Sequence, residues 1–170
     1  MKKERNRKYL LTINNPEKKG LTKEKIIKNI KKFSCKYFCL CAETGSQGVY
    51  HWHVFINYKN AIAFDTIKQN FPTAHIDAVL GTSKQNRAYI LKSAPEHNKK
   101  EDGSYKYKDS SGKEHKGINH EATFYEFGEC PDEQQGNRSD LERMYSLVKE
   151  GYTDSEILEA CGETAIKYID

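Results

Sequence analysis

The stretch Val49-Tyr-His-Trp-His-Val-Phe-Ile-Asn-Tyr58 decides the fold of this chain. It is rich in β-branched and aromatic residues, which predicts a strand. A similar run, Lys-Tyr-Phe-Cys-Leu-Cys-Ala-Glu over residues 36–43, precedes it, and the turn residues 45–48 separate the two. The two runs therefore predict an antiparallel hairpin. Both carry apolar residues on both faces, so we expect other elements to cover the sheet on both sides.

The flanking segments extend this hairpin into a domain that mixes strands and helices. Residues 8–14 predict a strand, which Asn15 and Pro16 end. Thr82 and Gln85 form a capping box for a helix that Pro95 stops. Two further helices, at about residues 22–32 and 61–70, and a strand at 74–80 complete the list. The order β-α-β-β-α-β-α predicts the α+β class, with an antiparallel sheet and flanking helices in the ferredoxin-like or RRM-like manner.

The C-terminal part has a different character. Residues 96–120 are polar and predict a loop or a loose hairpin, and residues 122–127 predict a last strand. Pro131 and Gly136 indicate a linker, after which helices are expected at 139–150 and from about residue 154. We therefore divide the chain into a domain over residues 1–127 and a linker with short helices over residues 128–170.

The composition excludes several classes of protein. The chain has 170 residues, of which 36% are apolar and 31% charged, and its mean hydropathy is −0.87. Its aromatic content of 11% is too high for a disordered chain. No run approaches the roughly 20 apolar residues of a membrane span, and the N-terminus does not predict a signal peptide. Five cysteines, an odd number, indicate reduced thiols rather than a disulfide framework.

The charges are divided unevenly along the chain. Residues 1–100 contain 20 Lys and Arg against 7 Asp and Glu, whereas residues 101–170 contain 8 against 17. A basic front half favours an anionic partner, and nucleic acid is the first candidate because Lys and Arg make most phosphate contacts. The alternative is that the lysine-rich helices are simply solvated.

Three side chains of the hairpin predict a metal site. Alternation places His51 and His53 on one face of their strand, with Trp52 on the other. Glu43 ends the preceding strand and comes opposite them across the hairpin. A carboxylate with two imidazoles suits Mn²⁺ or Mg²⁺ and would accept Co²⁺ or Zn²⁺. The alternative is an ordinary pair of hydrogen-bonded histidines.

The capped helix carries a second candidate group. Tyr89 and Lys92 are three residues apart and are expected to share a helix face, which Gln85 joins. A tyrosine hydroxyl becomes a useful nucleophile where a metal polarises its electrophile. The alternative is a core tyrosine beside a surface lysine. Asn14 and Asn15, at the end of the first predicted strand, could contact nucleotides or serve only the turn.

Taken together, these motifs resemble the HUH endonuclease domain of rolling-circle replication initiators, the Rep proteins of circular single-stranded DNA viruses and related plasmids. Leu-Thr-Ile-Asn-Asn-Pro at residues 11–16 is similar to the first motif of that family. His51-Trp52-His53 matches its His-hydrophobic-His motif, and Tyr89-x-x-Lys92 matches its third motif.

The resemblance implies an activity. Glu43, His51 and His53 would bind one divalent metal, which polarises the scissile phosphate of single-stranded DNA at a replication origin stem-loop. Tyr89 would attack and remain linked to the new 5′ end, and a 3′-OH would later reverse the reaction and join ends. Lys92 would orient the phosphate or the metal's water. Position 88 is alanine, so the chain resembles the single-tyrosine members.

The resemblance also bears on the rest of the protein. Full-length members carry a helicase, and the chain lacks a Gly-x-x-x-x-Gly-Lys-Ser/Thr loop, so we expect it to be the N-terminal part of a longer protein. Residues 129–170 would link to that helicase, support a homo-oligomer, or pack on the nuclease. The expected location is the cytoplasm of a bacterial host or the nucleus of a eukaryotic one.

Further DNA contacts are predicted around this site. A basic arm that contacts phosphates is expected before the first strand, formed by Lys2, Lys3, Arg5, Arg7 and Lys8. His75 and Asp77 share a strand face and could touch DNA near the cleavage point. Candidates for base stacking are the aromatic residues Tyr50, Trp52 and Tyr58, although core packing is preferred for Trp52.

Two other functions fit parts of these patterns. A non-catalytic RRM-like module would bind single-stranded nucleic acid through sheet aromatics and would not need Tyr89. An HUH transposase would use the same motifs in a different reaction.

Overall fold

The computed structural model describes residues 4–79, 81–133 and 139–161. Its contacts divide the chain into two units, residues 1–133 and 134–170, each of which is described by itself. Within the described residues, no helix combines the length and the apolar character needed to cross a membrane.

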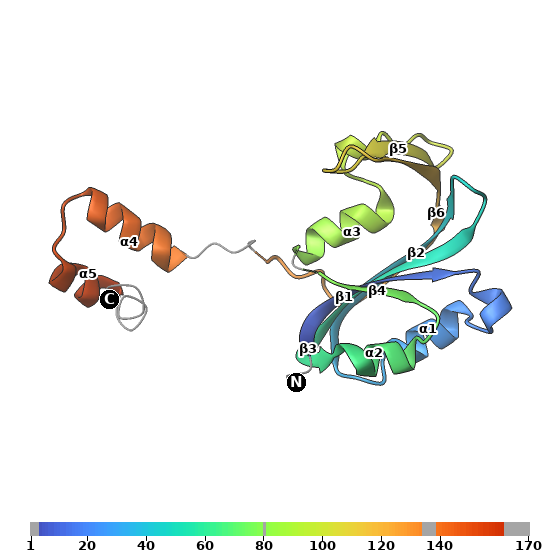
Figure 1. The fold of residues 1–170 in the computed structure, drawn as a ribbon, viewed down its shortest axis with the longest axis horizontal. Coiled ribbons are helices and arrows are strands. Elements are labelled where there is room, and N and C mark those ends of the chain that lie inside the picture. Colours follow the sequence, from blue (N-terminus) through green and yellow to red (C-terminus); the bar gives the residue numbers. More distant parts are fainter. Residues whose placement is uncertain (1–3, 80, 134–138, 162–170) are drawn as a thin grey trace. The chain divides into compact units, whose positions relative to one another are not determined.

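The first unit is an α+β domain built on one curled antiparallel sheet (Figure 1). Its strands run in the spatial order β4-β1-β3-β2-β6-β5. Their bounds are β1 Arg5–Asn14, β2 Cys35–Gly45, β3 Tyr50–Ala63, β4 His75–Ala78, β5 Ser104–Lys108 and β6 Glu114–Phe127. The helices are α1 Lys23–Ile30, α2 Phe64–Asn70 and α3 Ser83–Leu91, with 3-10 turns η1 Glu17–Lys19 and η2 Pro95–His97. The predicted fold class is confirmed.

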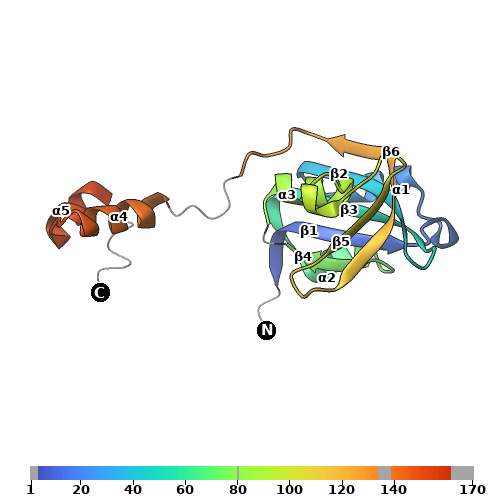
Figure 2. The same ribbon diagram turned by 90° about the horizontal axis from the view of Figure 1, so that it is seen from above.

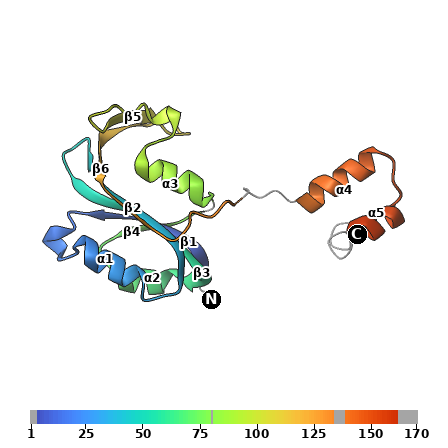
Figure 3. The ribbon, with the colours of Figure 1, turned by 180° about the vertical axis from the view of Figure 1, so that it is seen from behind.

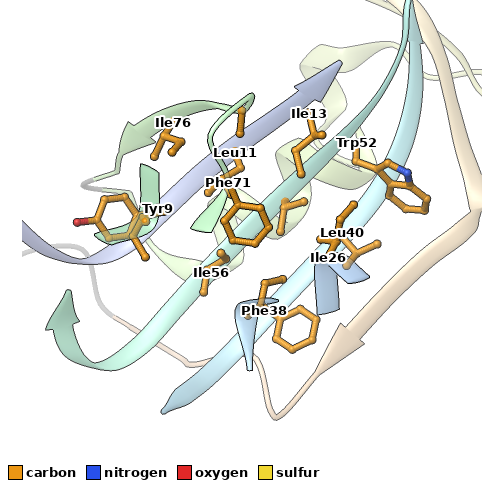
Figure 4. Close-up of a cluster of buried hydrophobic side chains, with 14 of the residues drawn as sticks. Tyr9, Leu11, Ile13, Ile26, Phe38, Leu40, Trp52, Ile56, Phe71 and Ile76 are labelled. Carbon is orange, nitrogen blue, oxygen red and sulfur yellow. The ribbon is translucent and has the colours of Figure 1, made fainter. Parts of the chain in front are cut away.

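The sheet is covered on both faces, as its apolar strands predicted. On one face, α1 and α2 bury the larger core, to which Ile67 of α2 belongs. Figure 4 shows Ile26 and Trp52 in this core. On the other face, Ile90 of α3 packs against a smaller cluster around Phe55. Figure 3 shows α3 on the side of the sheet opposite α1 and α2. The centre of the sheet is therefore shielded from water on both sides.

Side-chain caps define where the helices begin. Thr22 accepts a hydrogen bond from the N–H of Lys25 at the start of α1. Thr82 and Gln85 form the predicted capping box at the start of α3, with the Thr82 hydroxyl accepting from the Gln85 N–H and the Gln85 side chain accepting from the Thr82 N–H. Such caps satisfy N–H groups that have no partner within the helix. The start of α3 is thus determined by residues next to it in the sequence.

Several predicted boundaries were wrong. The strand expected at 8–14 begins at Arg5, and residues 61–63, expected in a helix, extend β3. Of the loop or loose hairpin expected at 96–120, the hairpin is confirmed: most of the stretch belongs to the β5–β6 hairpin, which curls over the face that carries α3 (Figures 1 and 2). Long-range pairing of β1 with β3 imposes the earlier start of β1 and the extension of β3, and it leaves little trace in local composition. Residue 80, the end of the strand expected at 74–80, lies outside the described residues.

In its described residues, 139–161, the second unit contains two short helices, α4 Ser139–Lys149 and α5 Asp154–Cys161, close to the predicted positions. Met144 of α4 and Ile157 of α5 are buried against each other. Residues 134–138 and 162–170 of the predicted C-terminal segment lie outside the described residues. The expected helicase link, oligomer contact or packing on the nuclease remains a prediction.

Candidate active site

Glu43, His51 and His53 converge on the face of the sheet that α3 covers. Strand pairing sets Glu43 of β2 opposite His51 of β3, and alternation puts His53 on the same face. Potential ligand atoms of the three residues all lie within 4.8 Å of one another. His51 Nε2 is 3.2 Å from Glu43 Oε1, and His53 Nε2 is 3.5 Å from Glu43 Oε2. We call these three residues the triad.

The remaining ring nitrogens of the histidines are held by neighbouring groups. His51 Nδ1 lies 3.0 Å from the Val49 carbonyl oxygen, which can only accept, so Nδ1 carries a proton and Nε2 is the nitrogen that can bind a metal. His53 Nδ1 lies 3.2 Å from the Thr12 hydroxyl. The two Nε2 atoms face each other at 3.2 Å. Burial lowers the pKa of His53, which favours the neutral form that binds metals.

Glu43 is an ionised carboxylate inside the protein. Burial by itself would raise its pKa, but His51, His53 and Lys92 outweigh burial and hold the pKa below its usual range. The Tyr105 hydroxyl donates to Oε1, and Lys92 Nζ lies 3.1 Å from Oε2. Even so, Oε2 accepts no well-directed hydrogen bond within the part of the chain that the structure describes. A buried carboxylate oxygen and two imidazole nitrogens that converge in this way fit a divalent cation.

Tyr89 stands beside the triad on α3. Its ring centroid is 5.4 Å from that of His53, and Lys92 Nζ lies 3.7 Å from the centroid of the Tyr89 ring. Burial raises the pKa of Tyr89, and nearby Tyr107 and Glu43 raise it further. The phenol is therefore protonated at neutral pH, and its reaction as a nucleophile requires that the site take up the proton.

Lys92 occupies a different position from the predicted one. Helix α3 ends at Leu91, and Lys92 is its C-cap with φ of 50°, a left-handed conformation that non-glycine residues adopt rarely. Its side chain is 1% exposed and lies between Glu43 and Tyr89. Such local strain is typical of functional sites, where the surrounding structure maintains it.

The β5–β6 hairpin supplies site residues that the sequence analysis missed. Tyr105 on β5 reaches Glu43 because Gly117 on β6 leaves it room: a Cβ on Gly117 would lie 2.9 Å from the Tyr105 hydroxyl and 2.5 Å from the Thr44 carbonyl oxygen. The other missed residues are Tyr107 on β5 and buried His97 on η2, whose ring centroids lie 4.7 Å apart. A signal was present, because tyrosines and lysines alternate in Ser-Tyr-Lys-Tyr-Lys over residues 104–108, as is typical of a strand.

Four of the predicted DNA contacts lie on or near the same face. Asn14 is exposed at the end of β1 and pairs with His51, and Asn15 follows in a left-handed turn. His75 and Asp77 on β4 form an exposed ion pair of 3.2 Å. Their strand partners in β1 are Thr12 and Leu10, the former of which contacts His53. These polar side chains therefore border the triad on the β1–β4 side.

The predicted basic arm was wrong in its placement of Arg5 and Arg7, which belong to β1 with Lys8, whereas Lys2 and Lys3 lie outside the described residues. Arg5 donates to the Ala61 carbonyl oxygen, whereas Arg7 is exposed. Lys8 Nζ is 2.9 Å from Glu133 Oε2. Two of the three cations are thus engaged by the protein itself.

The remaining polar and aromatic candidates have structural contacts. Gln85 accepts from the Thr82 N–H in the capping box, so its side chain is turned toward the start of α3 rather than toward Tyr89. Trp52 is buried in the larger core, as preferred, on the face opposite the triad. Tyr58 is 1% exposed, so the prediction that it stacks on bases was wrong, whereas Tyr50 is half-buried.

A family model with the description "Putative viral replication protein" matches residues 6–93, more than half of the chain. The chain belongs to this viral replication protein family. The match runs from β1 to just beyond α3 and so includes the triad, Tyr89 and Lys92. In this viral replication protein, η2 and the β5–β6 hairpin lie beyond the matched region. Curated proteins give no match to the chain.

Proposed function

We propose that this viral replication protein is a metal-dependent single-stranded DNA endonuclease and strand-transferase of the HUH type. It nicks a replication origin through Tyr89, forms a 5′-phosphotyrosine link, and later rejoins DNA ends in rolling-circle replication. The substrate is single-stranded DNA at an origin stem-loop.

One observation carries this proposal: a buried carboxylate–imidazole triad lies directly beside a tyrosine and a lysine. Ligand atoms of Glu43, His51 and His53 lie within 4.8 Å of one another, and the ring of Tyr89 contacts His53. A structural role alone does not account for two imidazole nitrogens and a carboxylate turned toward one point.

The triad would hold a divalent cation, which supplies Lewis-acid polarisation of the scissile phosphate. A mixed oxygen and nitrogen ligand set suits Mn²⁺ or Mg²⁺. On the protein side, the Val49 carbonyl and the Thr12 hydroxyl orient the two histidines. Tyr105 and Lys92 contact the two carboxylate oxygens of Glu43. Outer partners of this kind set the orientation and basicity of metal ligands.

The reaction is a transesterification that needs no external energy source. The Tyr89 oxygen forms a bond to phosphorus and gives up its proton, while the bond from phosphorus to the 3′ oxygen of the preceding nucleotide breaks. That 3′ oxygen takes up a proton and leaves as a free hydroxyl. Lys92 is placed to stabilise negative charge that develops near Tyr89, since its Nζ lies over the tyrosine ring. Attack by an incoming 3′-OH on the phosphotyrosine reverses the step and joins two ends.

The test uses single-stranded oligonucleotides that carry a candidate origin loop. The protein is incubated with them and Mn²⁺ and then resolved on a denaturing gel, where a covalent adduct appears as a shifted protein band. We expect the band to disappear in Tyr89→Phe and in EDTA, and to persist in Tyr145→Phe, which changes an exposed tyrosine of the second unit. Tight DNA binding without an adduct on any loop would instead favour the non-catalytic module.

A further inference from the structure

A basic groove adjoins the candidate active site on the β5–β6 hairpin. It has a volume of about 780 Å³ and lies between the hairpin, η2 and the end of β2. Its walls carry four lysines but only one acidic residue, Glu96. The two aromatic residues in its wall are Tyr105 and Tyr107. We call this feature the hairpin groove.

Three of the lysines are available to an external anion. Lys106 is paired with Glu114 at 2.8 Å. In contrast, Lys100, Lys108 and Lys116 are exposed and form no ion pair within the ranges that the structure describes. Lys92, which is nearer to the triad, already forms an ion pair with Glu43. The hairpin therefore concentrates uncommitted positive charge next to the site.

The groove and the triad share a wall. The Tyr105 ring lines the groove, while its hydroxyl donates to Glu43. Tyr107 lines the groove as well, and its phenol influences the pKa of Tyr89. For a strand whose scissile phosphate lies at the triad, the groove is therefore an adjoining surface.

We propose that the hairpin groove binds the single-stranded DNA segment adjacent to the scissile phosphate. Lys100, Lys108 and Lys116 contact its phosphates, and the half-buried Tyr107 offers ring surface to its bases. This combination of a positively charged groove and aromatic side chains is how proteins hold single strands with little sequence preference. The proposal rests on the proposed function for the position of the strand, but its residues lie outside the matched family region.

The test measures binding in EDTA, so that cleavage plays no part. Wild-type protein is compared with the triple variant Lys100→Gln, Lys108→Gln, Lys116→Gln, using a fluorescent oligothymidylate about 20 nucleotides long. The matched control is Lys28→Gln, Lys32→Gln, Lys59→Gln, which removes three exposed lysines elsewhere on the domain. Affinity is measured over a series of salt concentrations.

Each phosphate contact contributes about 0.7 to the salt slope for a single strand, so the groove variant should lose about 2 from the slope. Its affinity should fall at least about tenfold at ~0.1 M salt, with little change in the control. An unchanged slope, an equal loss in both variants, or a greater loss for duplex DNA than for the single strand would overturn the proposal. The adduct assay is separate: absence of an adduct together with the expected slope change would reject the proposed chemistry and leave the groove as a DNA site.

Discussion

Replacing Lys92 with methionine should destabilise the metal-free domain strongly. The side chain is 1% exposed, and its Nζ lies 3.1 Å from Glu43 Oε2, which is itself buried. Methionine preserves much of the length and volume but removes the charge. Glu43 then keeps Tyr105 and the two histidines as partners but loses the lysine ammonium beside Oε2.

The magnitude follows from the burial of the pair. Removal of one partner from a buried ion pair costs about 3–5 kcal/mol, because the other charge remains without compensation. Since Glu43 retains one hydroxyl donor and two imidazoles, we expect a value near the lower end, about 3 kcal/mol. A bound divalent cation supplies positive charge at the same carboxylate, so the loss should be smaller in Mn²⁺ than in EDTA.

Urea denaturation of both proteins, in EDTA and in saturating Mn²⁺, measures this free energy. Lys84→Met is a matched control on α3, because Lys84 pairs with an exposed aspartate and its loss should cost under about 1 kcal/mol. A double-mutant cycle with Glu43→Gln should give a coupling energy of about 2 kcal/mol. If Lys92→Met is as stable as the control in EDTA, or if the cycle shows no coupling, the assigned ion pair is incorrect.

Three further outcomes are expected. Tyr105→Phe should weaken Mn²⁺ binding about tenfold in calorimetry, because Glu43 loses a hydrogen-bond donor. The control Tyr107→Phe should have little effect on Mn²⁺ affinity. Equal affinities for Tyr105→Phe and wild type would contradict this. Burial opposes the ionisation of Glu133, but Lys8 and the first N–H group of α3 outweigh burial and lower the pKa of Glu133. Ionised Glu133 therefore stabilises the fold at a pH above the ordinary glutamate pKa of about 4.3, and this stabilisation is lost as the pH falls below that value. The difference in melting temperature between wild type and Glu133→Gln should therefore shrink from pH 7 to pH 3, and a constant difference would refute the assignment. Trp52→Phe should cost about 1–2 kcal/mol of stability without changing DNA affinity, and a loss of affinity at unchanged stability would show that Trp52 stacks on bases.

The central part of the site could be predicted because it depends on local periodicity. Alternation along β3 places His51 and His53 on one face, and a short hairpin brings Glu43 opposite them. The capping box positions α3, and with it Tyr89, from a few consecutive residues. These relations extend over short distances in the sequence and need little knowledge of the tertiary structure.

The surroundings of the site could not be predicted in the same way. Tyr105 contacts Glu43 across a separation of 62 residues, through a hairpin whose polar composition resembles that of a loop. The predicted basic arm failed because pairing with β3 draws Arg5 and its neighbours into β1. Lys92 enters the site because α3 ends at Leu91 and Lys92 itself adopts a left-handed conformation, which its residue type does not indicate. Each case depends on long-range pairing or on backbone geometry.

The most direct test of the central claim is to locate the covalent link. The adduct formed with Mn²⁺ and a cleavable oligonucleotide is digested with a protease and a nuclease, and the modified peptide is sequenced by mass spectrometry. We expect a nucleotide attached through phosphate to Tyr89. Attachment to Tyr105 or Tyr107, which lie near the same triad, would contradict it, as would an adduct that survives in the Tyr89→Phe variant.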